Sequence, residues 1–482
     1  MHTVHTVHTS LRGWLRHLGE TDRLVAIRPG VALKHELAAI AKRLDGRQAA
    51  YFPQPGGHAM PVVTGFMSRR SWIAEAMGVS EPQLLQRFRT AAEHPLPWTE
   101  VGDAPAQQVV HCFDATQGDI RTLLPIPTHS EHDDGPYITA GLVIARNPKT
   151  GVQNVSINRI QIHGRDRMGI LILPRHLHAY FAAAEAQGQA LDIAIVIGVD
   201  PLTALASQAI AAIDCDELTI AGALHGSPLP VVKCLTNDVR VPAEAEIVIE
   251  GRLLPHVREA EGPFGEFPKY YSAREEREVI QITAITHRRD PIFHTIVPAE
   301  MEHLLLGAIP REATLLAHLQ RSFPNVTDVH LSVGGVARYH LHVQMKKTRE
   351  GQAKNVILGA FAGHYDVKQV IVVDEDVNVH DPLEVEWAVA TRFQADRDLV
   401  VITGAQGSAL DPSTTVAFPG NKPALEWQGY GAKMGLDATK PLVSSEHVFT
   451  RVRIPGEREV DLESVVAATG AAALAGTPLA DA

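Results

Sequence analysis

The stretch NVSINRIQIHGRDRMGILILPRHLHAYF, residues 154–181, contains two strand patterns followed by the start of a helix. Its first residues read as a strand, a polar turn follows at Gly164–Arg167, and a second apolar run ends at Leu173, which predicts a β-hairpin. After Pro174, apolar residues recur at the spacing of a helix face. The stretch therefore predicts a hairpin that leads directly into a helix.

Short strand patterns surround this hairpin, and Gly, Pro, Asn and Asp separate them. The expected strands cover residues 138–145, 155–163, 168–173, 218–223, 245–250, 279–285 and 292–297. Their density predicts a β-rich, barrel-like middle domain.

Helix and strand patterns alternate on both sides of this domain. Residues 33–44 and 382–392 predict helices, 370–373 predicts a buried strand, and the Ala-rich segment 462–474 predicts a helix that docks on another surface. The fold class is therefore α/β (α+β). The expected parts are a small N-terminal α/β region at 1–118, the β-rich domain at 119–300, a C-terminal α/β domain at 301–443 and a tail at 444–482.

The composition is that of an ordinary globular protein of enzyme size, with 482 residues, 45% of them hydrophobic and 21% charged. A net charge of −11 argues against nucleic acid or an anionic membrane as a partner. No apolar run approaches the roughly 18 residues that a membrane span needs. The cysteines Cys112, Cys215 and Cys234 are odd in number and form no C-x-x-C pair, so we expect neither disulfides nor a thiolate metal site, and a cytoplasmic location.

The common catalytic motifs are missing from the sequence. It contains no G-x-x-x-x-G-K-[ST], no G-x-G-x-x-G between a strand and a helix, no H-E-x-x-H and no G-x-S-x-G. These absences argue against a P-loop enzyme, a dinucleotide-binding fold, a metalloprotease and a serine esterase.

Arg175 and His176 fall in the first turn of the helix that Pro174 opens. Free backbone N–H groups and the helix dipole favour an anion such as phosphate there, although a solvated helix start fits the same pattern. Glu217, expected just before a strand, can join Asn154 and His176 as a set of oxygen and nitrogen donors. Such a set suits Mn²⁺ or Mg²⁺ bridging a phosphate better than Zn²⁺; a surface Glu is the alternative.

The segment Glu261-Gly262-Pro263-Phe264-Gly265-Glu266 places two glycines and a proline between two carboxylates. This composition predicts a bent backbone on which both glutamates face one cavity. Like charges and burial raise a carboxyl pKa, while a nearby Arg keeps its partner ionised, so acid/base chemistry is one interpretation. A turn with two solvated glutamates is the other.

Several of these blocks, in this order and spacing, resemble the UbiD family of decarboxylases. The blocks are Asn154–Arg159, Pro174–His176, Glu217 with Ala221–Leu224, Val232–Cys234, Val241–Ala243, Glu246–Val248, Glu250–Gly251, Glu261–Glu266, Trp387–Arg392 and Lys433–Thr439. The resemblance covers the chain from about Leu11 to about Val443. It implies a central split-barrel flavin-binding domain and a C-terminal oligomerisation domain.

The resemblance also implies cofactors and partners. Members of the family use prenylated FMN, supplied by a separate prenyltransferase, to add or remove CO2 on unsaturated or aromatic acids, and they assemble as homodimers or homohexamers. Losing CO2 from an sp² carbon requires such an external electron sink, because no side chain can hold the electron pair. Carried over by position, the Mn²⁺ ligands are Asn154, His176 and Glu217, and K⁺ is expected near Ala206 and Ser207.

The cofactor and catalytic residues follow from the same resemblance. The residues expected to line the cofactor are Val155, Ser156, Ile157, Asn158, Arg159, Arg175 and Lys433. The expected catalytic network is Arg159, Glu261 and Glu266, with Glu266 as the proton donor, which must lie within hydrogen-bond reach of the carbon that it serves. Two positions depart from the common family pattern: Ser156 stands where Gly is frequent, and Asp133-Asp134-Gly135-Pro136 where a double glycine is usual.

The substrate is expected to be an aromatic or heteroaromatic acid. His303 and Arg311, eight positions apart, look like the subgroup that includes furan-2,5-dicarboxylate decarboxylase, in which such a pair meets the second carboxylate. An ordinary packing role for His303 is the alternative. For the whole chain, the alternatives are a flavin-independent, metal-dependent lyase or hydrolase, and a non-catalytic relative retained as an assembly partner.

Overall fold

The structure is a computed structural model, and it describes residues 7–114, 117–415, 430–443, 447–457, 459–469 and 472–473. The chain divides into two units, Met1–Thr439 and Lys440–Ala482. The second unit contains the short helix α15 (Leu462–Val465). The helix predicted for 462–474 is therefore wrong in length, and its residues 470, 471 and 474 lie outside the described part of the chain.

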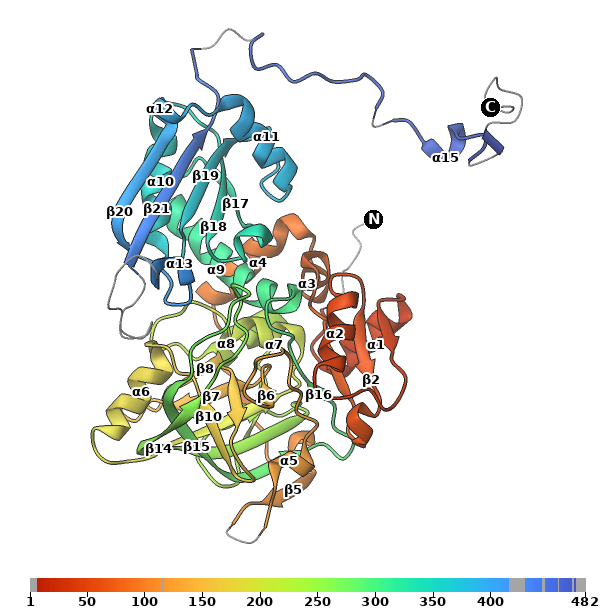
Figure 1. Cartoon of the computed structure of the whole chain (residues 1–482), viewed down its shortest axis with the longest axis vertical. Coiled ribbons are helices and arrows are strands. Elements are labelled where there is room, and N and C mark those ends of the chain that lie inside the picture. The colour runs from red at the N-terminus through yellow and green to blue at the C-terminus, as the bar shows by residue number, and fades with distance from the viewer. Residues whose placement is uncertain are drawn as a thin grey trace. The chain divides into compact units, whose positions relative to one another are not determined.

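The N-terminal part of the first unit is built on a four-stranded sheet with the order β1-β2-β3-β16 (Figure 1). The strands are β1 (Leu24–Ala26), β2 (Ala49–Phe52), β3 (Val62–Thr64) and β16 (Phe293–His294), and the helices are α1 (Leu11–Glu20), α2 (Glu36–Leu44), α3 (Arg70–Ala76) and α4 (Leu84–Glu93). The Ser10 side chain caps α1, and the helix buries one face that includes Trp14. The segment predicted as a strand at 292–297 contributes only β16, which pairs with β3 in this sheet.

The centre of the molecule is a nine-stranded, curled half-barrel with the order β6-β9-β10-β15-β14-β11-β7-β8, in which β5 also pairs with β15. Its strands are β5 (Val109–Cys112), β6 (Tyr137–Ile138), β7 (Leu142–Arg146), β8 (Gln153–Ile157), β9 (Ile160–Ile162), β10 (Arg167–Ile170), β11 (Leu191–Ile197), β14 (Ile247–Glu261) and β15 (Glu275–His287). The predicted hairpin is confirmed, because β9 and β10 pair in antiparallel register. The predicted β-rich middle of the chain is confirmed as well.

Two predicted strands of this sheet are interrupted. Residues 138–145 divide into β6 and β7, which belong to distant positions in the sheet, and Gly141 lies between them where an added Cβ would approach Ile195 to 2.7 Å. Residues 155–163 divide into β8 and β9, and Asn158 and Arg159 lie in the gap. The second interruption turns Arg159 away from the ladder and makes it available as a functional side chain.

The segment predicted as a strand at 218–223 is a helix, so that prediction is wrong. It forms α8 (Glu217–His225), and Glu217 is its first residue rather than a residue before a strand. The side chain of Asp216 caps this helix by accepting the Leu218 N–H, and Gly226 ends it in the left-handed conformation. Because nearly every side of α8 is buried, its apolar run carries no helical periodicity and resembles a strand.

Further helices pack against the half-barrel (Figure 1). They are α5 (Ile120–Leu123), α6 (His176–Glu185) and α7 (Pro201–Ala206), together with α8. Beside them lies a three-stranded sheet, β13-β12-β4, made of β4 (Thr99–Glu100), β12 (Pro230–Lys233) and β13 (Arg240–Pro242). The helix predicted after Pro174 is confirmed as α6, with Arg175 at its N-cap.

The C-terminal part of the first unit is a five-stranded mixed sheet with the order β17-β18-β19-β21-β20. Its strands are β17 (Val326–Leu331), β18 (His340–Met345), β19 (Gln369–Asp374), β20 (Leu399–Gln406) and β21 (Tyr430–Ala438), and its helices are α9 (Met301–Ser322), α10 (Gln352–Gly363), α11 (Pro382–Arg392), α12 (Ala395–Asp398) and α13 (Pro412–Thr415). The predicted helix at 382–392 and the predicted strand at 370–373 are both confirmed. Across the described residues, no helix is long and apolar enough to cross a membrane.

We expect Asp200→Ala to lower the free energy of unfolding by on the order of 3 kcal/mol. The buried Asp200 carboxylate accepts hydrogen bonds from the backbone of Leu202 and Thr203 at 2.9 and 3.0 Å, and it pairs with His225 at the end of α8 at 3.0 Å. Chemical denaturation measures the loss. As a control, Asp381→Ala removes the more exposed cap of α11 and should cost about 1 kcal/mol; equal losses in the two variants would contradict this account of the α7–α8 junction.

Candidate active site

Arg159 lies between two glutamates that are far from it in sequence. Its Nε and Nη2 donate to Glu261 Oε1 and Oε2 at 2.9 and 2.7 Å, and its Nη1 pairs with Glu266 Oε1. The Arg159 side chain is 7% exposed, that of Glu261 0% and that of Glu266 12%. Glu261 is therefore committed to a two-bond contact, whereas Glu266 makes one contact and keeps an oxygen available.

The electrostatics of this group are set by burial and by the carboxylates. Burial alone would lower the pKa of Arg159, but the charges of Glu266 and Glu261 raise it above its ordinary value. Arg159 therefore stays cationic, and one guanidinium neutralises part of the charge of two carboxylates. The sequence-based prediction is that a nearby Arg keeps one of the two glutamates ionised, and the structure places Arg159 against both of them.

The bend between the two glutamates is held by backbone contacts. Gly262 has φ +86°, and an added Cβ there would meet the Ala273 carbonyl at 2.6 Å, so only glycine fits. The Gly262 N–H donates to Gln161 Oε1 at 3.1 Å, and the Gly265 N–H donates to Asp133 Oδ1 at 2.9 Å. Asp133, which departs from the family pattern, therefore fixes the backbone immediately before Glu266.

Two aromatic rings line the bend. Phe264 is buried, and the Arg159 guanidinium lies 5.3 Å from its ring centroid. Tyr137 packs on Phe264 with ring centroids 4.5 Å apart, and burial followed by the charge of Glu261 raises the Tyr137 pKa above its ordinary value. Sequence analysis did not find Tyr137, because it lies in a two-residue strand with no motif around it.

Asn154, His176 and Glu217 come together from three elements, β8, α6 and α8. His176 Nδ1 lies 3.1 Å from Asn154 Oδ1, and Glu217 Oε2 accepts the N–H of Val155, the residue after Asn154, at 2.7 Å. Asn154 and Glu217 are 4% and 3% exposed, and Asn154 Nδ2 is buried without a hydrogen-bond partner. The structure thus brings together a predicted donor set whose members are 22 to 63 positions apart in sequence.

The chemistry of this set fits a hard divalent cation that bridges an anion. Burial raises the pKa of Glu217 to about 8, and burial followed by Arg175 lowers the pKa of His176, which favours the neutral imidazole that binds metals. A cation would stabilise the buried carboxylate, and the unpartnered Asn154 amide can donate to an anion. The residues present therefore fit a metal ion with a phosphate group.

The N-termini of α6 and α8 carry two members of this set, His176 and Glu217. No side chain caps α6, so its first N–H groups are free to meet an anion, and Arg175 stands at its N-cap. Arg175 Nη2 donates to Tyr365 Oη at 3.3 Å. Lys433 on β21 donates to the carbonyls of Tyr365 and Val367 at 2.8 and 2.6 Å, and burial lowers its pKa to about 8.

The other residues predicted to line a cofactor lie along and just after β8. Ser156 Oγ donates to Asn158 Oδ1 at 2.9 Å, and Asn158 Nδ2 donates to the Leu171 carbonyl at 3.0 Å, while Ile157 is partly buried beside them. Ala206 and Ser207 stand at the C-terminal end of α7, where Ser207 Oγ donates to the Ala204 carbonyl at 2.7 Å. No hydrogen bond found among the described residues links Ala206 or Ser207 directly to the Asn154 set.

His303 and Arg311 lie on one face of α9, two turns apart. Gly307 lies between them on that face, and an added Cβ there would collide with the guanidinium of Arg338. Arg338 donates to the Leu304 carbonyl at 3.1 Å, and burial followed by the charge of Arg311 lowers its pKa to about 9. Sequence analysis missed Arg338; only the glycine at the midpoint of the pair points to a side chain packed there.

The polar contacts of this face of α9 leave N–H donors and positive charge that suit an anion. Burial followed by Arg338 lowers the pKa of His303 to about 3, and its Nδ1 accepts the Ala299 N–H at 3.1 Å, so its proton is on Nε2. Arg311 donates to His364 Nε2 at 3.2 Å and lies 3.5 Å from Asp366. Asp366 is thus one carboxylate for two buried guanidinium groups, those of Arg311 and Arg338, so the net charge of these three side chains is positive.

Family models match most of the chain. The model described as 3-octaprenyl-4-hydroxybenzoate carboxy-lyase Rift-related domain matches residues 99–301. The N-terminal and C-terminal domain models of the same carboxy-lyase match residues 15–92 and 304–438.

Relatives match over nearly the full chain. Anhydromevalonate phosphate decarboxylase of Methanothermobacter thermautotrophicus is 38% identical over 92% of this chain and 99% of its own. The UbiD-class enzyme HmfF from Pelotomaculum thermopropionicum, solved in complex with FMN, is 47% identical with a TM-score of 0.90, covering 95% of this chain and all of that one. An evolved dimeric form of HmfF in complex with prFMN is 45% identical with a TM-score of 0.86 over the same shares.

We expect Glu261→Gln to destabilise the protein more than Glu266→Gln. The first change leaves a buried guanidinium without its two-bond partner and should cost on the order of 3 kcal/mol, whereas the second leaves that contact intact and should cost about 1 kcal/mol. Urea denaturation of the two variants measures the difference. Equal losses, or a larger loss for Glu266→Gln, would show that the two carboxylates share Arg159 differently.

Proposed function

The chain belongs to the UbiD family of carboxy-lyases, and we propose that it is a reversible, non-oxidative decarboxylase of a heteroaromatic acid that uses prenylated FMN. The observation that carries the proposal is the buried Arg159 between Glu261 and Glu266, beside a donor set that fits a metal ion and a phosphate. The FMN and prFMN in the similar HmfF structures support the choice of cofactor.

The proposed cofactor site uses the two helix N-termini. Asn154, His176 and Glu217 would hold Mn²⁺ against the flavin phosphate, and Arg175 and the free N–H groups of α6 would bind the phosphate itself. Residues 155–159 and Lys433 would line the flavin, and the carbonyl and hydroxyl oxygens at Ala206 and Ser207 would bind K⁺. When bound, the prenylated flavin supplies the electron sink that loss of CO2 from an unsaturated carbon requires.

The catalytic roles follow from the unequal contacts of the two glutamates. Glu261, held by two bonds, fixes the position of Arg159. Glu266, with one contact and partial exposure, holds the proton that it delivers to the carbon that has lost CO2, and removes it in the carboxylation direction. The clamp of Asp133 on Gly265 keeps the Glu266 backbone in place for both directions.

The excess positive charge on α9 supports a substrate with a second anionic group. His303 Nε2–H, Arg311 and Arg338 present donors on one helix face, which favours a dicarboxylate such as furan-2,5-dicarboxylate. A phosphate would meet the same donors, and the similar archaeal enzymes are named for a phosphorylated acid. We favour the dicarboxylate because His303 and Arg311 have the separation of the pair that meets the second carboxylate in the subgroup that includes furan-2,5-dicarboxylate decarboxylase.

We also propose how the cofactor is supplied and how copies of the chain assemble. A separate prenyltransferase would provide the cofactor, and copies of the chain would associate through the C-terminal domain as a homodimer or homohexamer; a dimeric form is known for evolved HmfF. The cysteines at 112, 215 and 234 are free, which suits a reducing cytoplasm.

We expect Glu266→Gln to reduce turnover at least 100-fold and to leave FMN binding within about twofold, because only the proton donor is removed. The measurement is decarboxylation and H/D exchange of enzyme co-expressed with a prenyltransferase, over furoic, furandicarboxylic, pyrrole, indole, hydroxybenzoic and cinnamic acids. Full activity of Glu266→Gln would contradict the assigned donor. Wild-type protein that turns over with Mn²⁺ but binds no flavin would instead favour a flavin-independent lyase or hydrolase.

We expect Arg311→Gln to raise KM for furan-2,5-dicarboxylate about 10- to 100-fold while KM for furan-2-carboxylate changes little, because the lost charge meets only the second carboxylate. Arg321→Gln, the same change in the last turn of α9, is the matched control. Equal effects of Arg311→Gln on both acids would remove the proposed subsite, and turnover restricted to a phosphorylated unsaturated acid would assign the same donors to a phosphate.

A further inference from the structure

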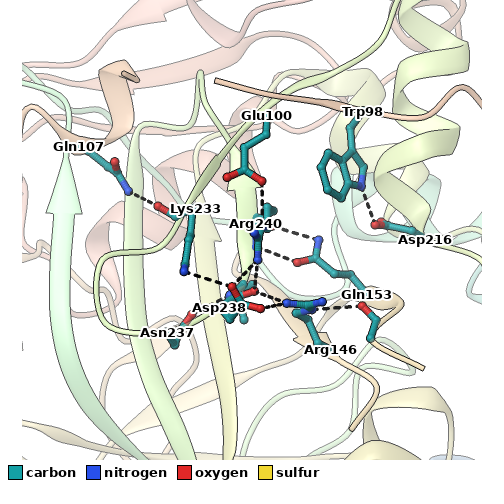
Figure 2. A network of polar contacts seen from close by, with 12 residues as sticks. Trp98, Glu100, Gln107, Arg146, Gln153, Asp216, Lys233, Asn237, Asp238 and Arg240 are labelled. Atoms are coloured by element: carbon teal, nitrogen blue, oxygen red, sulfur yellow. Dashed lines mark hydrogen bonds and ion pairs between the residues drawn. The ribbon is translucent and has the colours of Figure 1, made fainter. Parts of the chain in front are cut away.

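Two of the proposed metal ligands have direct sequence neighbours whose side chains are held by other contacts. Asp216 precedes Glu217 at the start of α8, and Gln153 precedes Asn154 on β8. Because adjacent residues of a strand point to opposite faces, Gln153 faces away from the side that Asn154 serves. Figure 2 shows Asp216 in contact with Trp98, and Gln153 in contact with Arg240.

The Trp98 indole completes the contacts of Asp216. Trp98 Nε1–H donates to Asp216 Oδ2 at 2.9 Å, while Oδ1 accepts the Leu218 N–H at 2.9 Å (Figure 2). Both carboxylate oxygens are therefore occupied. Asp216 cannot turn to compete with Glu217 for a cation without breaking a helix cap and a half-buried indole hydrogen bond.

The chain that carries Trp98 is fastened to α8 at further points. The Leu96 N–H donates to the Thr219 carbonyl at 2.9 Å. At Gly222 an added Cβ would lie 3.0 Å from the Leu96 carbonyl, so the glycine allows this close approach. The first turns of α8, and with them Glu217, are thus held from outside the proposed cofactor site.

Gln153 forms the corresponding clamp on β8. Its Oε1 accepts the Arg240 N–H at 2.7 Å and its Nε2 donates to the Arg240 carbonyl at 3.2 Å, which ties β8 to β13. The Arg240 side chain is itself held by Glu100 at 3.0 Å and by Asp238 at 2.6 Å (Figure 2). Glu217 links α8 directly to β8, because its Oε2 accepts the Val155 N–H.

We propose that Trp98 and Gln153 are positioning residues that set the separation of Asn154 and Glu217, and thereby the affinity for the divalent cation and for the phosphate end of the flavin. The proposal rests on the function proposed above. Neither residue belongs to the donor set. Trp98 acts through its contact with Asp216, the neighbour of Glu217, whereas Gln153 is itself the neighbour of Asn154 and acts through its contacts with Arg240. Trp98 also determines which of two adjacent carboxylates can bind the cation: it holds Asp216 in its role as helix cap, so that Glu217 is the ligand.

The test uses the full-length, cofactor-free chain, with Mn²⁺ titrated by electron paramagnetic resonance and flavin binding followed by fluorescence. Trp98→Phe keeps an aromatic side chain but loses the indole N–H donor. We expect the affinity for Mn²⁺ to fall on the order of 10-fold, and the affinity for FMN, measured in the presence of Mn²⁺, to fall similarly. Riboflavin, which lacks the phosphate, should bind the variant as it binds wild type. Gln153→Met should behave like Trp98→Phe.

Trp14→Phe is the matched control, because Trp14 Nε1–H also donates one hydrogen bond at 2.9 Å, to the Phe66 carbonyl in the N-terminal part of the chain. We expect it to lose stability without changing the ratio of FMN to riboflavin affinity. Asp216→Asn has one acceptor oxygen, so it can keep the helix cap or the indole hydrogen bond but not both; we expect it to retain only part of the affinity that Asp216→Ala loses.

The outcomes separate this proposal from the proposed function. If wild type binds Mn²⁺ and FMN but Trp98→Phe and Gln153→Met bind both as well as wild type, or if Trp14→Phe loses as much, the positioning role is wrong and the function stands. If wild type binds neither Mn²⁺ nor FMN, the proposed cofactor site fails, and this proposal fails with it.

Discussion

The burial of one guanidinium group organises the catalytic half of this protein. Arg159 is 7% exposed, and a cation at that depth is stable only if it is paired and hydrogen-bonded. The pairing brings the break between β8 and β9, the end of β14 and the bend after Glu261 into contact. Arg159 is shared unequally, with two bonds to Glu261 and one contact to Glu266, and the roles proposed for the two carboxyl groups rest on this difference.

The other half of the site depends on helix ends. The N-termini of α6 and α8 meet β8, so that an imidazole, a carboxylate and an amide lie together beside the uncapped N-terminus of α6. Carboxylates at such a place are attracted by the helix dipole, but they also compete with one another. Asp216 and Glu217 are adjacent, and the contacts of Asp216 with Trp98 and Leu218 decide which of them is available.

The proposed substrate end, on α9, adds a third constraint, which is charge. α9 carries His303 and Arg311 two turns apart, and Gly307 between them leaves room for Arg338 to pack against the helix. Burying guanidinium groups with too few carboxylates around them costs free energy, and a bound anion would lower that cost. That deficit supports a substrate with two anionic groups more than a monoacid.

The sequence by itself predicted the features that neighbouring residues encode. The β9–β10 hairpin and α11 follow from local periodicity, the bend at 261–266 from its glycines and proline, and the cofactor and catalytic sets from blocks that resemble a family. Periodicity failed at α8, where burial on nearly all sides removes the helical pattern, although Asp216 before the run and Gly226 after it are local helix signals.

Local sequence patterns could not identify four further features: Tyr137, Trp98, Arg338 and the hydrogen bond between Gly265 and Asp133. Only the tertiary structure decided them, because their partners lie far along the chain: Asp133 and Gly265 are separated by 132 positions and Trp98 and Asp216 by 118. The chemical character of a side chain is local, whereas its role is set by the buried partner that folding brings to it.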